Sequence, residues 1–220
     1  VAYVYRRGSD GWQLETVLSH PTPAASDQFG MDVALSEDGS TLAVSVPGSG
    51  PRTVSTAGPG EVFVYVRAGS TWTLNARLAA GHGDAVDGFG YALAMASDGA
   101  TIAVGAPGEA SAARGINGDE SDNSAVYSGA VFVFARTGTS WGQQAYIKAS
   151  NADAQDAFGG AISMDGTGSL LAVGAPVESS GASGVNGDAS NNDSAESGAV
   201  YLYARGAGGW VERDYVKASN

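Results

Sequence analysis

The sequence predicts an all-β fold, a β-propeller whose blades each contain four antiparallel strands. The main observation is one phrase written three times: a Phe-Gly pair, an alternating strand, a tight turn and an apolar strand that ends at proline. The pairs begin at Phe29, Phe89 and Phe158, so the second interval is somewhat longer than the first. The same two intervals separate three prolines, Pro47, Pro107 and Pro176. Two landmarks with matching intervals indicate an internal repeat.

A second strand pair accompanies each phrase, and its second strand begins at tryptophan. The four tryptophans, at positions 12, 72, 141 and 210, keep the shorter interval once and the longer one twice. Asp-Gly turns between alternating runs, as at Asp98-Gly99, favour hairpins. Each full repeat therefore holds four strands, here named A to D. One such sheet cannot bury both of its faces, whereas radial stacking of blades can, and we expect the tryptophans to fill space between blades.

Two strands precede three complete repeats, so about 3.5 blades are present. We predict a half blade (strands C and D) at residues 1–20 and blades at 21–80, 81–151 and 152–220. Propellers typically have 4–8 blades, so we expect this chain to be part of a larger ring cut from a longer polypeptide. Two such copies would supply seven blades. The half blade leaves a strand edge open, and we predict that it pairs with another segment or chain.

Composition excludes several function classes. The chain has 220 residues, 33 glycines and no cysteine, which removes disulfides, thiolate nucleophiles and Cys-ligated metals. Its net charge of -12 argues against a nucleic-acid partner and suits cations. No apolar run approaches the ~20 residues needed to span a bilayer, so no membrane span is expected.

The repeated phrase resembles the FG-GAP repeat family, known from integrin α-subunit propellers and from bacterial surface proteins. Phe89-Gly90 with Gly105-Ala106-Pro107 matches the family name, as does the third copy, whereas the first copy has Ser45-Val46-Pro47. The resemblance covers nearly the whole chain. It implies a propeller, a secreted or cell-surface location and a role in cell adhesion or other extracellular interaction.

The calcium loop that integrin-type repeats carry between strands A and B is missing here. The corresponding turns, such as Ser97-Asp98-Gly99, are too short and too poor in carboxylates. Calcium sites of the family therefore cannot be carried over to these positions.

Instead, long B–C connections in the second and third repeats collect the hard oxygen donors that calcium prefers. The two loops align at the same offset as the second and third Phe-Gly pairs, and the first repeat has a shorter connection, residues 48–60, without an acidic residue. The candidate ligands are Asn117, Asp119, Asp122 and Asn123 in one loop, and Asn186, Asp188, Asn192 and Asp193 in the other. The alternative is that these side chains only close their own turns.

In a propeller the B–C loops and the D–A links share one face, and by analogy with integrins this face binds ligands. We therefore expect a protein or glycan ligand there. For the Asp two places before each phenylalanine (Asp27, Asp87 and Asp156) a structural turn role is favoured. A catalytic residue should break the repeat, yet the acidic loops obey it, and no Gly-x-Ser-x-Gly or His-Glu-x-x-His motif occurs. We predict a non-enzymatic extracellular interaction module, with a purely structural repeat as the alternative.

Overall fold

The computed structural model describes residues 1–25, 27–48 and 59–219, and within them all regular structure is β-strand. The strands form one two-stranded sheet and three four-stranded sheets, and all pairings are antiparallel. The half blade contains β1 (Ala2–Gly8) and β2 (Gly11–Leu18), and the first full blade contains β3 (Val33–Leu35), β4 (Thr41–Val46), β5 (Glu61–Ala68) and β6 (Thr71–Leu78). The second blade contains β7 (Ala92–Met95), β8 (Thr101–Ala106), β9 (Ala130–Thr137) and β10 (Ser140–Ile147), and the third contains β11 (Ala161–Met164), β12 (Leu170–Ala175), β13 (Ala199–Gly206) and β14 (Gly209–Val216).

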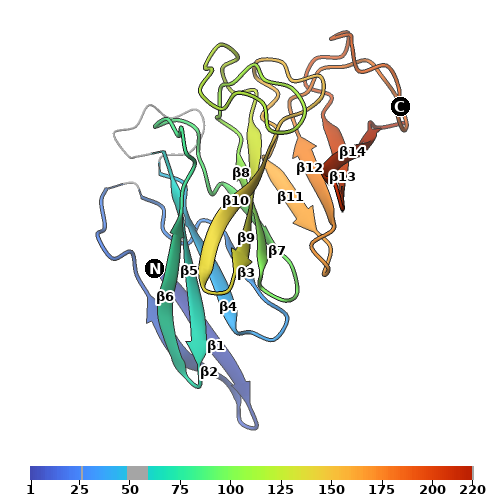
Figure 1. Ribbon diagram of the computed structural model, residues 1–220. Helices are drawn as coiled ribbons and strands as arrows, with labels where there is room; N and C mark the ends of the chain where they lie inside the picture. Colours follow the sequence, from blue (N-terminus) through green and yellow to red (C-terminus); the bar gives the residue numbers. More distant parts are fainter. Residues whose placement is uncertain (26, 49–58, 220) are drawn as a thin grey trace.

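Each full blade is a simple meander in which neighbouring strands follow one another in sequence. Figure 1 shows the sheets side by side in chain order, with the short hairpins at one end and the long connections at the other. The predicted all-β fold with four-stranded, propeller-type blades is thereby confirmed.

The core lies between the sheets, because each sheet presents apolar side chains on both faces. One buried cluster joins the half blade to the first blade, a second joins the first and second blades, and a third joins the second and third blades. Phe89 and Phe158 are fully buried at the second and third of these junctions. Phe89 packs edge-on against Phe132 with ring centroids 5.4 Å apart, and Phe158 packs on Tyr201 at 5.3 Å. The Phe-Gly phrase therefore builds the blade junctions.

A β-bulge recurs at the same position of every C–D strand pair. The residues that the register skips are Glu15, Asn75, Gln144 and Arg213. A bulge re-aims a side chain, and two of these residues reach the tryptophan of the following blade. The indole nitrogen of Trp72 donates to Glu15 at 2.9 Å, and that of Trp141 donates to Asn75 at 3.0 Å. The tryptophans at these two junctions pack between blades, as expected.

The half blade lacks the two strands that accompany the other sheets. Within the described part of the chain, β1 pairs only with β2, so pairing of its free edge with another segment or chain stays a prediction. Its outward side chains Tyr3, Tyr5 and Trp12 are exposed. Most of the short B–C connection of the first repeat lies outside the described residues, which resume at residue 59. No helix long and apolar enough to cross a membrane occurs in the described ranges.

Candidate functional site

The long connections gather at one end of the blades, which we call the loop face. It contains the β8–β9 connection (residues 107–129), the β12–β13 connection (residues 176–198) and the links that precede the Phe-Gly pairs, residues 79–88 and 148–157. Figure 1 places both long loops at the same end, above neighbouring blades. The loops and the links therefore lie on one face, as expected.

A buried ion pair fixes the base of the first long loop. Lys148 Nζ donates to Glu109 Oε2 at 2.7 Å and to Ser128 Oγ at 2.6 Å. All three residues are fully or almost fully buried. Glu109 Oε1 in turn accepts from the backbone N–H of Ser111, whose hydroxyl donates to the carbonyl of Asp119. The start, middle and end of the loop are thus tied to one ammonium group of the following link.

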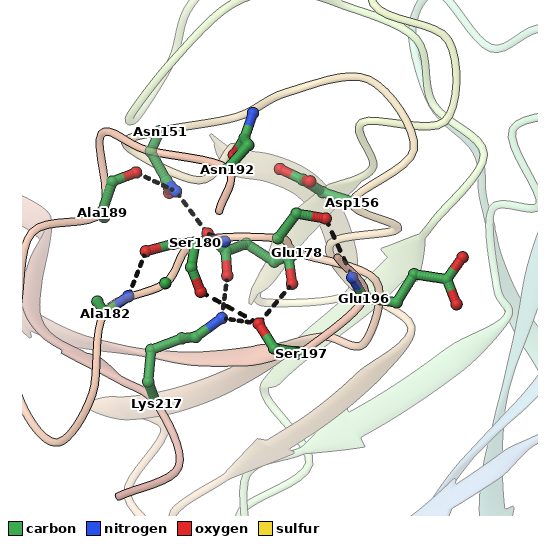
Figure 2. A network of polar contacts seen from close by, with 12 residues as sticks. Asn151, Asp156, Glu178, Ser180, Ala182, Ala189, Asn192, Glu196, Ser197 and Lys217 are labelled. Carbon is green, nitrogen blue, oxygen red and sulfur yellow. Dashed lines mark hydrogen bonds and ion pairs between the residues drawn. The ribbon is translucent and has the colours of Figure 1, made fainter. Parts of the chain in front are cut away.

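The second long loop repeats this arrangement at the equivalent positions of the third repeat. Lys217 Nζ donates to Glu178 Oε2 at 2.7 Å and to Ser197 Oγ at 2.6 Å, and Figure 2 shows these three side chains converging. Ser180 takes the role of Ser111, donating to the carbonyl of Asp188. Asn151 extends the network, since its amide donates to Glu178 and to the carbonyl of Ala189. We call each Lys–Glu–Ser set a hub.

The lysine and serine of the hub are found only in the repeats with a long loop. At the position of Lys148 the first repeat has Ala79, and at the position of Ser128 it has Pro59. Burying an ammonium is costly unless it is paired and hydrogen-bonded. The buried lysine therefore requires the glutamate, which is supplied by the long loop. Sequence reasoning missed the hubs, although a lysine in the same phrase of both long-loop repeats, and absent from the short one, was visible.

A further buried carboxylate lies near each hub, Asp87 beside Glu109 and Asp156 beside Glu178. Burial raises the pKa of Asp87 to about 6, with the negative charge of Glu109 adding to the effect. Burial likewise raises the pKa of Asp156 to about 6, beside Glu178. Burial also lowers the pKa of Lys148, opposed by Glu109. The positive charge of Lys148 opposes the rise of the pKa at both aspartates.

The same aspartates close the turn before each Phe-Gly pair. Asp87 Oδ2 accepts from the backbone N–H of Asp84 at 2.7 Å, and Asp156 Oδ2 accepts from that of Asp153 at 2.9 Å. Asp27 accepts in the same way from the N–H of Ala24. All three carboxylates thus make the turn contact that the favoured structural role requires.

Of the eight candidate calcium ligands, Asn117 and Asn186 lie where each loop turns against its blade's last strand. The side-chain oxygen of Asn117 accepts from the N–H of Tyr146 at 3.0 Å, and that of Asn186 accepts from Tyr215 at 2.8 Å. Both asparagines have left-handed backbones, with φ of 58° and 56°, a conformation that Asn tolerates better than most residues. Isolated bridges beside them, Ile116 to Ile147 and Val185 to Val216, join each loop to that strand.

Asp119 and Asp188 each cap a turn. Asp119 Oδ1 accepts from both the N–H and the hydroxyl of Ser121, and Asp188 Oδ1 does the same with Ser190. The Ser121 hydroxyl holds the pKa of Asp119 below its usual value, and the Ser190 hydroxyl has the same effect on the pKa of Asp188. The contacts are those of local turns.

Asp122 corresponds to Asn191, a residue that the candidate set omitted. Asp122 Oδ2 accepts from the N–H of Ala112 at 2.7 Å, and Asn191 Oδ1 accepts from that of Gly181 at 2.8 Å. The N–H of Asp193 also donates to Asn191 Oδ1. A strict alignment of the two loops, without gaps, would have identified Asn191, because it places Asp193 opposite Ser124.

Asn123 and Asn192 connect the loops to the links of their own blades. The amide of Asn123 donates to Asp84 Oδ2 at 2.6 Å, and that of Asn192 donates to Asp153 Oδ2 at 3.1 Å. Arg114 of the first loop also pairs with Asp153, at 3.2 Å. Loops and links of adjacent blades therefore form one polar surface.

Comparison with protein-family models agrees with this architecture. The FG-GAP repeat model matches residues 72–134 and 141–203, each match running from a tryptophan through the next Phe-Gly pair into the following C strand. The chain belongs to the FG-GAP repeat family. The resemblance read from the repeated phrase is thereby confirmed. A search of curated proteins gave no match.

Seven of the eight candidate calcium ligands in these FG-GAP loops make side-chain hydrogen bonds within the protein. The side-chain oxygens of five candidates accept hydrogen bonds from their own loop or from the last strand of the blade, and the amides of Asn123 and Asn192 donate to link carboxylates. No group of three or more His, Asp or Glu able to hold a metal ion occurs in the described ranges. The arrangement fits turn closure, so we derive no step through calcium. Calcium binding by the two loops stays a prediction.

Proposed function

We propose that this FG-GAP chain is a non-enzymatic interaction module, secreted or exposed at a cell surface, that binds a protein or glycan ligand on its loop face. FG-GAP repeats provide a propeller-type scaffold, and a scaffold of this kind presents its connections as a recognition surface. Adhesion is the class of function that this proposal favours.

The observation that carries the proposal is the rigid presentation of two equivalent loops. Each loop is fixed at its base by a hub whose lysine and glutamate are buried, and each is hydrogen-bonded to its link through Asn123 or Asn192. A long connection that only bridges two strands needs no such bracing. Pre-organised loops lose less conformational entropy when a ligand binds, which is a reason to brace a recognition surface.

The charge of the loop face indicates the chemistry of the ligand. Exposed acidic side chains on it include Asp119, Asp188, Asp193 and Glu196, while the basic residues nearest to them are largely engaged, Arg114 with Asp153 and the two hub lysines with glutamates. Acidic surfaces attract basic partners. We therefore expect a basic protein surface, or a glycan whose amino sugars carry free, protonated amines, as the ligand.

The proposal is tested by binding of the chain to arrays of basic extracellular proteins and of amino-sugar glycans. The double variant Asp193→Lys/Glu196→Lys should lose binding, since both carboxylates are exposed on the loop face. Asp10→Lys, at a hairpin on the opposite end of the blades, is the matched charge reversal and should leave binding unchanged. Equal binding by both variants, or binding to neither array, would favour the alternative of a purely structural repeat.

A further inference from the structure

A polar cavity with a volume of ≈ 220 Å³ lies at the junction between the second and third blades, beside the last strand of the second blade. We call it the junction cavity. The second blade contributes Gln144 and Ala145 of β10, together with Asn117 of the long loop, and the third blade contributes Arg205 and Trp210 of the β13–β14 hairpin. None of the acidic side chains proposed above to bind a basic ligand lines this cavity.

At the junction of the half blade with the first blade, the equivalent position is filled by a carboxylate of the protein itself. Glu15, the bulge residue of β2, accepts from Nε of Arg67 at 2.7 Å and also from its Nη2. The indole nitrogen of Trp72 donates to the same carboxylate at 2.9 Å. The side chain of Glu15 is only 7% exposed. A guanidinium and an indole N–H of one blade thus form a carboxylate site.

The third blade supplies the same two donor residues without a carboxylate. Arg205 and Trp210 pair across their hairpin as Arg67 and Trp72 do. The bulge residue of the preceding blade is here the neutral Gln144. Arg205 is exposed, and its side chain forms no ion pair or hydrogen bond with any residue that the structure describes.

The indole of Trp210 shows the missing acceptor most directly. Trp210 is 6% exposed and lines the cavity, yet its Nε1 has no hydrogen-bond partner within the described ranges. At the preceding junction the indole of Trp141 donates to Asn75, and Arg136 lies over its ring at 5.8 Å. A buried donor without an acceptor is costly, and this cost is avoided at the first two junctions but not at the third.

A second contact of the repeat indicates the same chemistry. Asn186, the counterpart of Asn117, donates from its amide to Asp214 Oδ1 at 3.0 Å. The second blade has Ala145 at the position of Asp214. The amide of Asn117 therefore makes no hydrogen bond within the described part of the chain, although its oxygen is held by the N–H of Tyr146. The junction cavity thus lacks two carboxylates that equivalent positions of other repeats carry, while the donors to both are present.

We propose that the junction cavity binds the carboxylate of an acidic ligand, in the place that Glu15 fills at the first junction. The indole nitrogen of Trp210 and the guanidinium of Arg205 would donate to this carboxylate. The amide of Asn117 offers a further donor to a second acceptor of the ligand. The cavity corresponds to about seven water volumes, so a short dicarboxylic acid or a glutamate side chain is the class of ligand that it suits.

Entry of the ligand requires one side chain to move. The indole nitrogen of Trp210 has almost no exposed surface, and the repeat places the bulge residue against it, as Glu15 and Asn75 show. The corresponding Gln144 is exposed, lines the cavity and makes no side-chain hydrogen bond in the described ranges. Its displacement therefore breaks no such bond.

The affinity should be modest, because the net charge of -12 opposes the binding of an anion. We expect a dissociation constant of about a millimolar. The donors act at short range, so they determine which anion binds even though the field of the whole chain does not attract it.

The test is an NMR titration of the full 220-residue chain with glutarate at constant ionic strength. The indole N–H resonance of Trp210 is assigned by its loss in Trp210→Phe. Glutarate should shift this resonance along a saturable curve and leave the resonances of Trp72 and Trp141 unchanged, since their indoles already have acceptors. Glutaramide, which has the same shape without the charge, should bind at least about tenfold more weakly.

Position 144 provides a matched series of variants. Gln144→Glu recreates the arrangement of Glu15, so it should move the Trp210 resonance in the absence of ligand and abolish the glutarate titration. Gln144→Ala clears the entrance and should bind glutarate at least as tightly as the unchanged chain. Arg205→Gln, at an exposed position, should keep the melting temperature and lower the affinity at least about tenfold.

Two further arms separate the source of the carboxylate and the two proposals. Tighter binding of a capped Gly-Glu-Gly peptide than of glutarate would identify an acidic protein segment as the source, and the reverse order would identify a free acid. The loop-face variant Asp193→Lys/Glu196→Lys should still bind glutarate, so a failure of the proposed function is distinguishable from a failure here.

Three results would overturn the proposal. The first is no shift of the Trp210 resonance at several tens of millimolar glutarate. The second is an equal shift with glutaramide or with chloride, which would indicate a general solvent effect. The third is undiminished glutarate binding by Gln144→Glu, which would place the anion elsewhere.

Discussion

The indole nitrogen of Trp141 donates a hydrogen bond of 3.0 Å to the side-chain oxygen of Asn75, across the junction between the first and second blades. Asn75 is the extra residue of a β-bulge, and Trp72 makes the same contact with the bulge residue Glu15. At each of these two junctions the bulge thus directs a polar side chain to the indole nitrogen, which is the only polar side-chain atom of the tryptophan. A junction between blades is therefore specified by a hydrogen bond as well as by packing.

Replacing Asn75 with alanine should cost about 1 kcal/mol of unfolding free energy, the usual net contribution of a hydrogen bond of this kind. The matched control is Gln144→Ala. It occupies the equivalent bulge, yet the indole nitrogen of Trp210 has no hydrogen-bond partner among the residues that the structure describes, so no bond is lost. Urea denaturation of both variants measures the difference, and equal losses of stability would contradict a specific role for the Trp141 contact.

Removal of one hub lysine should be strongly destabilising. Lys148→Met leaves Glu109 buried without its partner, and breaking a buried pair in this way typically costs about 3–5 kcal/mol. Adding Glu109→Gln should recover part of the loss, because the unpaired charge is then removed while the acceptor for Ser111 remains.

The control for the hub is the exposed pair of Arg213 with Asp214, whose atoms lie 3.9 Å apart. Arg213→Met should change the unfolding free energy by less than about 1 kcal/mol. Thermal and urea unfolding of the three variants give the comparison. A loss for Lys148→Met as small as that for Arg213→Met would show that the hub does not stabilise the loop base.

Stability should fall as pH rises from about 4 to about 6. The pKa of Asp87 and that of Asp156 are raised from 3.8 to about 6 by burial. In this window the folded chain keeps protons that the unfolded chain releases, so the folded state loses stability as the pH increases. The contribution is present below pH 4 and absent above pH 6.

The double variant Asp87→Asn/Asp156→Asn isolates this effect, since the amide oxygens can still accept from the N–H groups of Asp84 and Asp153. Its unfolding free energy should vary less between pH 4 and 6 than that of the unchanged chain. An identical pH dependence in both proteins would rule out the two aspartates as its source.

Calcium binding is decided by calorimetric titration of the EDTA-treated chain. The sequence-based prediction requires a binding heat that disappears in the double variant Asp119→Ala/Asp188→Ala, together with a melting temperature that rises with calcium. Turn closure alone requires no heat. In that case the variant loses the same stability with and without calcium, because only the contacts to Ser121 and Ser190 are removed.

The fold was predictable because its signal is periodic. Phe-Gly pairs, prolines and tryptophans at matching intervals locate every blade, and alternating apolar residues locate the strands. The contacts between loop and link carry no such signal, since they join residues far apart in sequence. The constant offset between the second and third repeats identified the two loops as equivalent, but it could not show that Asn123 reaches back across the blade to Asp84.

The hubs and bulges were not predictable from pattern alone. Lys148 is a charged residue directly after an apolar strand, where exposure is the usual expectation, and its burial follows only from the position of Glu109 across the loop. The residue pattern around Asn75 contains no break that would indicate a bulge. Both features depend on tertiary neighbours. The candidate site predicted from the sequence therefore consisted of the polar and acidic loop residues and did not include the hub residues that hold the loops.

The matching of hub and loop has a consequence for how this chain can change. The second and third repeats each carry the long loop with its glutamate, serine and lysine, whereas the repeat with Ala79 lacks both the long loop and the lysine. The long loop and its hub lysine therefore occur together in the second and third repeats, and both are absent from the first. If the loop were grafted onto another repeat, the lysine should have to be introduced as well. Without it, the glutamate of the grafted loop would have no ammonium partner.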